Sequence, residues 1–188
     1  MTERIIIRQR TRILTPREYI LLRRELNPVY QVICDCLLHT GMRVEELWEF
    51  LQHPHWYHAS ARVIDLPIGS IKKVKTLHKE RSVKLAKDGC NAVEVLISIK
   101  PKKISRQSMH EVLINASTRA GIGTKGITSK MFRKTNLSWL VAIHPEKALY
   151  VASHAGHTID VLQQHYLGIA FTREDINDMR TFFKGWDE

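Results

Sequence analysis

Apolar residues recur every three to four positions along most of this chain, which is the spacing of amphipathic helices. The first such segment begins at Thr15-Pro16-Arg17-Glu18. Thr15 can cap a helix there, Pro16 suits its first position, and Glu18 completes a capping box. Because Asn27-Pro28 follows, we expect this helix to end near Leu26.

The same spacing predicts further helices, several of them opened by Ser or Thr and closed by Gly. They cover residues 29–39, 43–51, 105–120, 129–141, 145–152, 158–166 and 172–184. Tyr166 is expected at or just past the end of its helix, and Gly185 is expected to stop the last one.

Short segments of another kind lie between the third and fourth of these helices. Residues 53–60 read as a loop, and residues 61–66, 70–76 and 81–85 read as strands, with Gly69 at a turn. Residues 91–99 are apolar, and the pattern there fits a strand or a helix. The predicted fold class is mostly α with a small antiparallel β-sheet (α+β).

Size and charge narrow the choice of partner. The 188 residues, 44% of them hydrophobic, suit one globular domain, with residues 1–11 as an extended arm or an edge strand. A formal net charge of +10 favours a polyanionic partner, with nucleic acid as the first candidate.

No apolar run approaches the roughly 20 residues that span a bilayer, so no membrane contact is expected.

The cysteines and the clustered histidines predict no metal site. Cys34-Asp35-Cys36 lacks the two-residue spacing of common metal and redox motifs, and Cys90 stands alone. Three reduced thiols indicate a cytoplasmic, or nucleoid-associated, protein. His53, His55 and His58 surround Trp56 without an obvious further ligand.

The candidate chemistry lies in two arginines, a histidine and a late tyrosine. Arg43 follows Thr40-Gly41-Met42, Arg133 ends Lys130-Met131-Phe132-Arg133, and Tyr166 stands nine residues after His157. Such a set suits attack on a phosphodiester, because cationic groups can hold the non-bridging oxygens while the tyrosine hydroxyl acts as the nucleophile.

In this order of motifs, the chain resembles the catalytic domain of the tyrosine recombinases (phage-integrase family) over about residues 12–170. The matching parts are Arg43 with Glu46 in a Thr-Gly-x-Arg-x-x-Glu-Leu turn, Lys75 on a hairpin, Lys130 with Arg133, Gly156-His157, and Tyr166. The resemblance implies that Arg43 and Arg133 clamp the scissile phosphate. It also implies that Lys75 protonates the leaving oxygen and that Tyr166 forms a 3′-phosphotyrosine.

Several positions leave alternatives open. Lys73 or Lys79 can replace Lys75 as the general acid, His154 is an alternative to His157, and Tyr150 is the fallback for Tyr166. Lys130 stands where the family most often has histidine, which leaves the general base open, and Lys134 replaces the family's usual second histidine. Further contacts with DNA phosphates are predicted for Lys72, Lys73, Lys79, Arg81, Lys102 and Lys103.

The predicted function is therefore a site-specific DNA recombinase or integrase of a mobile element that needs no metal or other cofactor. The resemblance implies four protomers on two DNA duplexes, with residues 172–188 packing on their own domain or on a neighbour. The family's N-terminal DNA-clamping domain is expected to be absent, which makes an accessory DNA-binding protein a candidate partner. The alternatives are a type IB topoisomerase, a DNA-binding relic that no longer cuts, and an RNA-binding module.

Overall fold

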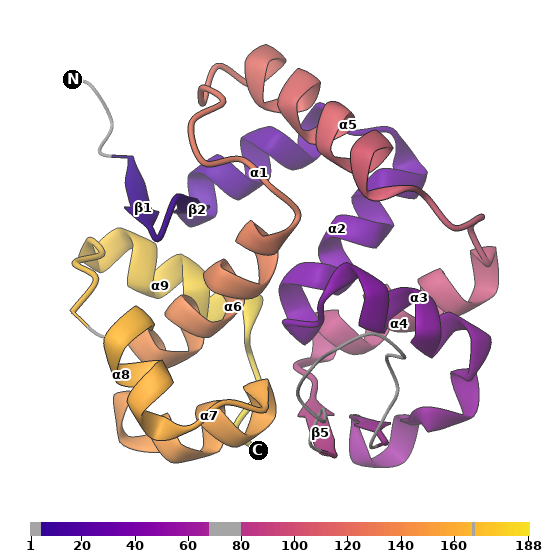
Figure 1. Ribbon diagram of the computed structural model, residues 1–188. Coiled ribbons are helices and arrows are strands. Elements are labelled where there is room, and N and C mark those ends of the chain that lie inside the picture. The colour runs from indigo at the N-terminus through magenta and orange to yellow at the C-terminus, as the bar shows by residue number, and fades with distance from the viewer. Residues whose placement is uncertain (1–4, 68–79, 167) are drawn as a thin grey trace.

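The computed structural model describes residues 5–67, 80–166 and 168–188 (Figure 1). Its helices are α1 Pro16–Arg24, α2 Pro28–Thr40, α3 Val44–Gln52, α4 Lys87–Ile99, α5 Arg106–Arg119, α6 Lys130–Ile143, α7 Ala148–Ala155, α8 Ile159–Tyr166 and α9 Arg173–Phe182. Its strands are β1 Ile6–Arg8, β2 Thr11–Ile13, β3 Tyr57–His58, β4 Val63–Leu66 and β5 Arg81–Lys84. The predicted fold class, mostly α with small antiparallel β structure, is confirmed.

The predicted end signals set most helix boundaries. Thr15 and Glu18 form the expected capping box at the start of α1. Gly41 ends α2 with a φ of +60°, a left-handed conformation that glycine adopts without cost. The predicted helix at 145–152 differs, because residues Pro145–Lys147 form a 3₁₀ turn and α7 begins only at Ala148.

The three-stranded sheet contains the two predicted strands that fall among the described residues, and Tyr57–His58, within a segment predicted as a loop, adds a short third strand. β4 pairs antiparallel with β5, from Val63↔Lys84 to Leu66↔Arg81, and β3 pairs with the other edge of β4. The ambiguous residues 91–99 are helical and belong to α4. The predicted strand at 70–76 lies outside the described residues, and so do Lys72, Lys73, Lys75 and Lys79.

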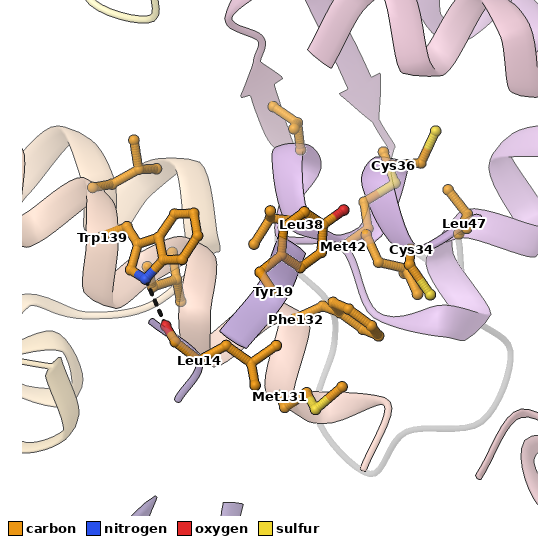
Figure 2. Packing of buried hydrophobic residues seen from close by; sticks show 14 of the residues in the cluster. Leu14, Tyr19, Cys34, Cys36, Leu38, Met42, Leu47, Met131, Phe132 and Trp139 are labelled. Atoms are coloured by element: carbon orange, nitrogen blue, oxygen red, sulfur yellow. Dashed lines mark hydrogen bonds between the residues drawn. The ribbon is translucent and has the colours of Figure 1, made fainter. Parts of the chain in front are cut away.

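The segment expected as an arm or edge strand forms a hairpin, in which β1 pairs with β2 from Ile6↔Ile13 to Arg8↔Thr11. The hairpin packs on α6. Directly after β2, the Leu14 backbone N–H donates to Thr135 Oγ1 at 3.0 Å, and the Leu14 carbonyl accepts from Trp139 Nε1 at 2.9 Å (Figure 2). These bonds fix the hairpin to the helix that carries Lys130 and Arg133.

Helix α6 runs through the core and contacts α2, β2, α7, α8 and α9. The Tyr19 ring meets Phe132 and Trp139 edge-on at 6.5 and 6.4 Å between centroids (Figure 2). All three cysteines are free and buried. Across the described residues, no helix has the length and apolar character needed to cross a membrane.

The C-terminal segment packs on its own domain in this structure. Helix α9 lies against α6 and α1, with Met179 and Phe183 buried. Trp186 is fully buried, stacks on His144, and donates from Nε1 to the Lys84 carbonyl at 3.1 Å. This segment thereby reaches strand β5.

Candidate active site

Five of the predicted catalytic residues line one cavity of 1020 Å³. They are Arg43 before α3, Lys130 and Arg133 on α6, His157 between α7 and α8, and Tyr166 at the end of α8. The turn at residues 9–11 and the start of α5 also contribute to its wall. The sixth, Lys75, lies outside the described residues.

Arg43 owes its place to the tight turn that joins α2 to α3. A Cβ on Gly41 would lie 2.5 Å from Asn136 Oδ1, so the close approach of this turn to α6 requires glycine. The Arg43 backbone N–H donates to Glu46 Oε2 at 2.7 Å, and its Nη1 donates to Glu46 Oε1 at 2.8 Å. Because the Arg43 side chain is 40% exposed, its guanidinium keeps donors available to the cavity.

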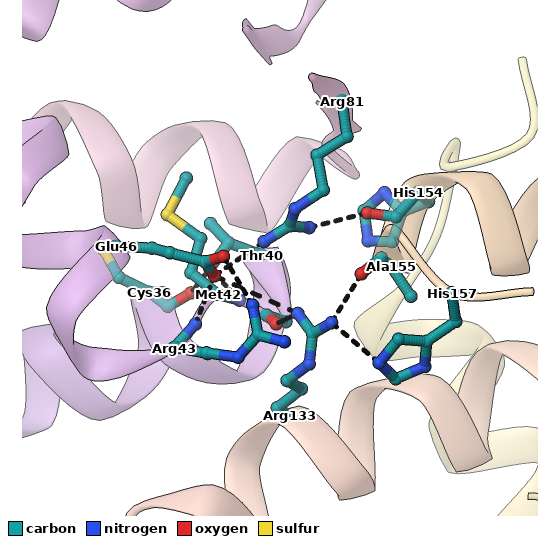
Figure 3. A network of polar contacts seen from close by, with 11 residues as sticks. Cys36, Thr40, Met42, Arg43, Glu46, Arg81, Arg133, His154, Ala155 and His157 are labelled. Carbon is teal, nitrogen blue, oxygen red and sulfur yellow. Dashed lines mark hydrogen bonds and ion pairs between the residues drawn. The ribbon is translucent and has the colours of Figure 1, made fainter. Parts of the chain in front are cut away.

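Glu46 is the buried anion that holds the arginines together (Figure 3). Its Oε2 accepts from Arg81 Nη2 at 2.6 Å and lies 4.0 Å from Arg133 Nη1. Burial alone would raise the pKa of Glu46, but the charges of Arg81 and Arg133 and the N–H of Arg43 outweigh it and hold that pKa below its usual range. A charged Glu46 is therefore the counterion of the cluster.

Arg133 is buried and held from two sides. Its Nη1 donates to the Gly41 carbonyl at 2.7 Å, and its Nη2 donates to the Ala155 carbonyl and lies 3.2 Å from His157 Nε2 (Figure 3). Burial, followed by the charge of Arg81, lowers the pKa of Arg133 to about 9, so the group still carries its charge at neutral pH. The guanidinium is preorganised for an anion at the cavity wall.

Arg81 corrects one prediction. It was expected among the exposed DNA contacts of the hairpin, yet only 8% of it is exposed. Its Nη2 pairs with Glu46 and its Nη1 donates to the His154 carbonyl at 2.7 Å. Both terminal nitrogens of this guanidinium are therefore engaged by the protein itself.

Tyr166 lies beside these cations. Its ring stacks on His157 with centroids 6.1 Å apart and planes 22° apart. Burial raises the pKa of the Tyr166 hydroxyl, while Arg133 and Arg43 act in the opposite direction. The hydroxyl is therefore neutral at pH 7 and has to lose its proton during any attack.

The two fallback residues occupy different places. His154 is buried, its Nδ1 accepts from the Lys84 backbone N–H at 3.2 Å, and burial, with Arg81 second, lowers its pKa to about 3. Tyr150 is 47% exposed on α7 and packs against Trp186. Neither residue lines the cavity.

The remaining predicted cations differ in position. Lys130 is exposed at the first position of α6 and lines the cavity. Lys102 and Lys103 are exposed in the loop between α4 and α5, away from the cavity wall. Within the described ranges, no three His, Cys, Asp or Glu side chains gather as metal ligands.

One residue of the cavity wall was missed from the sequence. Arg10 lies at the tip of the β1–β2 hairpin and lines the cavity beside the predicted residues. The available signal was a pair of polar residues, Gln9-Arg10, between two short segments of strand character.

The fold is that of tyrosine recombinase catalytic domains. Among solved structures, the chain is similar to XerA recombinase, with a TM-score of 0.63 and 16% identity over 95% of this chain and 65% of that one. It is likewise similar to the Tn1549 transposon integrase in complex with circular intermediate DNA, with a TM-score of 0.65 and 17% identity over 88% of this chain and 64% of that one. The chain thus spans slightly less than two thirds of each of these two chains, and the likeness is one of fold. No protein-family model and no curated protein matches the sequence.

Proposed function

We propose that this protein breaks and rejoins DNA strands as a tyrosine-type site-specific recombinase or integrase. The observation that carries the proposal is the convergence of Arg43, Arg133, His157 and Tyr166 on one cavity, although 123 positions of the chain separate Arg43 from Tyr166. A tyrosine hydroxyl beside two arginines that share a buried counterion suits attack on a phosphodiester, because the cations can stabilise the negative charge that develops on the phosphate oxygens.

In the proposed reaction, Tyr166 Oη attacks the scissile phosphorus and gives up its proton. The bond from phosphorus to the 5′-oxygen breaks, that oxygen takes up a proton, and a 3′-phosphotyrosine remains. Arg43 and Arg133 hold the non-bridging oxygens as negative charge builds on them, and His157 donates beside Arg133. Lys130 is a further phosphate ligand, and the resemblance assigns the leaving-group proton to Lys75.

The second half of the reaction reverses the first with a different strand. A free 5′-hydroxyl attacks the phosphotyrosine, which restores a phosphodiester and the Tyr166 hydroxyl. One phosphodiester bond is exchanged for another, so the reaction needs no external energy source and no cofactor is proposed.

The proposed partner is double-stranded DNA. The net charge of +10 supports this choice, and the similar Tn1549 integrase is described in complex with DNA. We further propose that four protomers act on two DNA sites of a mobile element, with an accessory DNA-binding protein as an additional partner. Lys102 and Lys103 then contact phosphates beyond the cavity.

Covalent trapping tests the cleavage step. Wild-type protein is mixed with nicked duplexes of randomised sequence, from which a short cleaved strand diffuses away, and adducts are counted after denaturation. The proposal predicts an adduct that Tyr166→Phe abolishes and that the matched control Tyr150→Phe retains. Wild-type protein that binds DNA without forming an adduct would contradict the cleavage step and leave a non-cutting DNA-binding protein.

A further inference from the structure

The turn between β1 and β2 has an unusual backbone for its sequence. Gln9 and Arg10 have φ values of 47° and 61°, in the left-handed region. Two-residue hairpin turns of this shape normally use Asn-Gly or another glycine-containing pair, because a Cβ is disfavoured there. Strained residues of this kind persist where the surrounding structure holds them, and they gather at functional sites.

The turn is held firmly to the helix that carries the candidate active site. Lys134 on α6 donates from Nζ to the Arg8 carbonyl at 2.8 Å and to Gln9 Oε1 at 3.2 Å. On the other strand, the Arg12 backbone N–H donates to the Gly126 carbonyl at 2.9 Å, and the Arg12 guanidinium forms a buried ion pair with Glu18. The tip of the hairpin therefore keeps a fixed position relative to α6.

At that tip, Arg10 places an exposed cation on the wall of the active-site cavity, which Lys130, Lys134 and Tyr166 also line. No carboxylate among the described residues pairs with the Arg10 guanidinium. Burial lowers the pKa of Lys134, and the charge of Lys130 adds to this effect. A cation that meets no carboxylate in the described part of the chain, held by a strained turn, is suited to an anion from outside the chain.

We propose that Arg10 is a further phosphate-binding residue of the active-site cavity and that Lys134 positions the turn that carries Arg10. The inference rests on the proposed function, since it takes DNA as the occupant of the cavity. Arg43 and Arg133 hold the scissile phosphate, so Arg10 contacts a different phosphate of the same backbone. Lys134 stands where the family usually has histidine. Its Nζ donates hydrogen bonds to Arg8 and Gln9, so it contributes to DNA binding by holding the hairpin that carries Arg10.

The test measures DNA affinity over a series of salt concentrations for the variants Arg10→Gly and Arg10→Lys. The control is Arg24→Ala, which removes an exposed cation that does not line the cavity. Loss of one phosphate contact predicts that Arg10→Gly reduces the slope of log K against log salt by about 0.9. Glycine relieves the turn, so the thermal unfolding midpoint of this variant is expected to hold or rise. Arg10→Lys should keep most of the slope.

Lys134→Met tests the positioning role. It is expected to weaken DNA binding in the wild-type background and to add no further loss in the Arg10→Gly background, because it acts through the position of Arg10. Additive losses in the double variant would overturn the role of Lys134. If Arg10→Gly binds DNA as Arg24→Ala does, the role of Arg10 is wrong while the proposed function stands. If wild-type protein binds no DNA, the proposed function itself fails.

Discussion

At the scale of single residues, the site depends on one carboxylate shared by three guanidinium groups. Glu46 contacts Arg43 and Arg81 directly and lies at the edge of ion-pair distance from Arg133. Without this anion, the mutual repulsion of the arginines would oppose their gathering in a buried place. We therefore assign the stability of the cluster to Glu46 and the binding of phosphate to Arg43. Substitutions of the two residues can test these roles separately.

Glu46→Gln should destabilise the protein by about 3 kcal/mol, because removing the anion leaves buried arginines without a counterion. Arg43→Ala removes a side chain that is 40% exposed, and it should change stability by less than about 1 kcal/mol. The same substitution should slow adduct formation by about 100-fold or more, through loss of a donor to the developing charge. Urea unfolding and single-turnover trapping measure the two effects. Equal loss of stability in both variants would contradict the division of roles.

His154 makes a second residue-scale prediction, which concerns acid. Burial lowers the pKa of His154 to about 3 in the folded protein. At pH values between about 3 and the ordinary histidine pKa, the unfolded chain therefore binds a proton on this residue and the folded protein does not. Stability is therefore complete above the ordinary histidine pKa and falls as the pH drops, by about 1.4 kcal/mol per pH unit for this group. His154→Asn keeps an acceptor for Lys84 without titrating. Its free energy of unfolding between pH 4 and 6 should decline less steeply than that of wild type, and an unchanged slope would contradict the assignment.

The sequence predicts which residues meet at the cavity where each belongs to a motif that is local in the sequence. Arg43, Arg133, His157 and Tyr166 were all assigned from motifs, and the structure brings them to one cavity. The burial of Arg81 was not predicted, because it depends on Glu46, which lies 35 positions away. Arg10 was missed because its place on the cavity wall depends on packing of the hairpin against α6.

At the scale of elements, capping residues predicted where helices begin better than runs of apolar residues predicted the type of element. The capping residues Thr15 and Thr172 start α1 and α9 as expected, since each satisfies free backbone N–H groups locally. Residues 91–99 gave no such signal of their own. They are helical because α4 begins at Lys87 and packs along α2, a contact that local sequence does not reveal.

The C-terminal segment supplies the element-scale prediction. Trp186 is fully buried among His144, Tyr150 and His154, and it bonds to β5 through the Lys84 carbonyl. Trp186→Ala should lower the free energy of unfolding by about 3–5 kcal/mol through the cavity it leaves. Urea unfolding at two protein concentrations measures this loss. A loss well below 1 kcal/mol would show that the segment does not pack on its own domain in solution.

At the scale of the whole molecule, the cavity joins parts of the chain that are far apart. In Figure 1, α3 belongs to the group around α2 and α4, whereas α7 and α8 lie with α6 and α9. Arg133 links the two groups, because it bonds to both the Gly41 and the Ala155 carbonyls. Assembly of the site is therefore coupled to folding of the complete domain.

The net charge of +10 leads to the prediction at this scale. If the protein contacts six or more phosphates, its affinity for duplex DNA should fall by about 1000-fold between 50 and 200 mM salt. Fluorescence anisotropy with a labelled duplex measures this dependence, with a single-stranded RNA of equal length as the comparison. An affinity that changes little with salt, or a preference for the RNA, would contradict duplex DNA as the partner.

The most direct measurement of the central claim is the identity of the residue that joins DNA. The trapped adduct is digested with nuclease and trypsin, and the residual nucleotide is located by mass spectrometry. Tyr150 and Tyr166 share the tryptic peptide of residues 148–173, so fragment ions must distinguish them. The account predicts a nucleotide attached through its 3′-phosphate to Tyr166. A nucleotide on Tyr150 or on any other residue would contradict it.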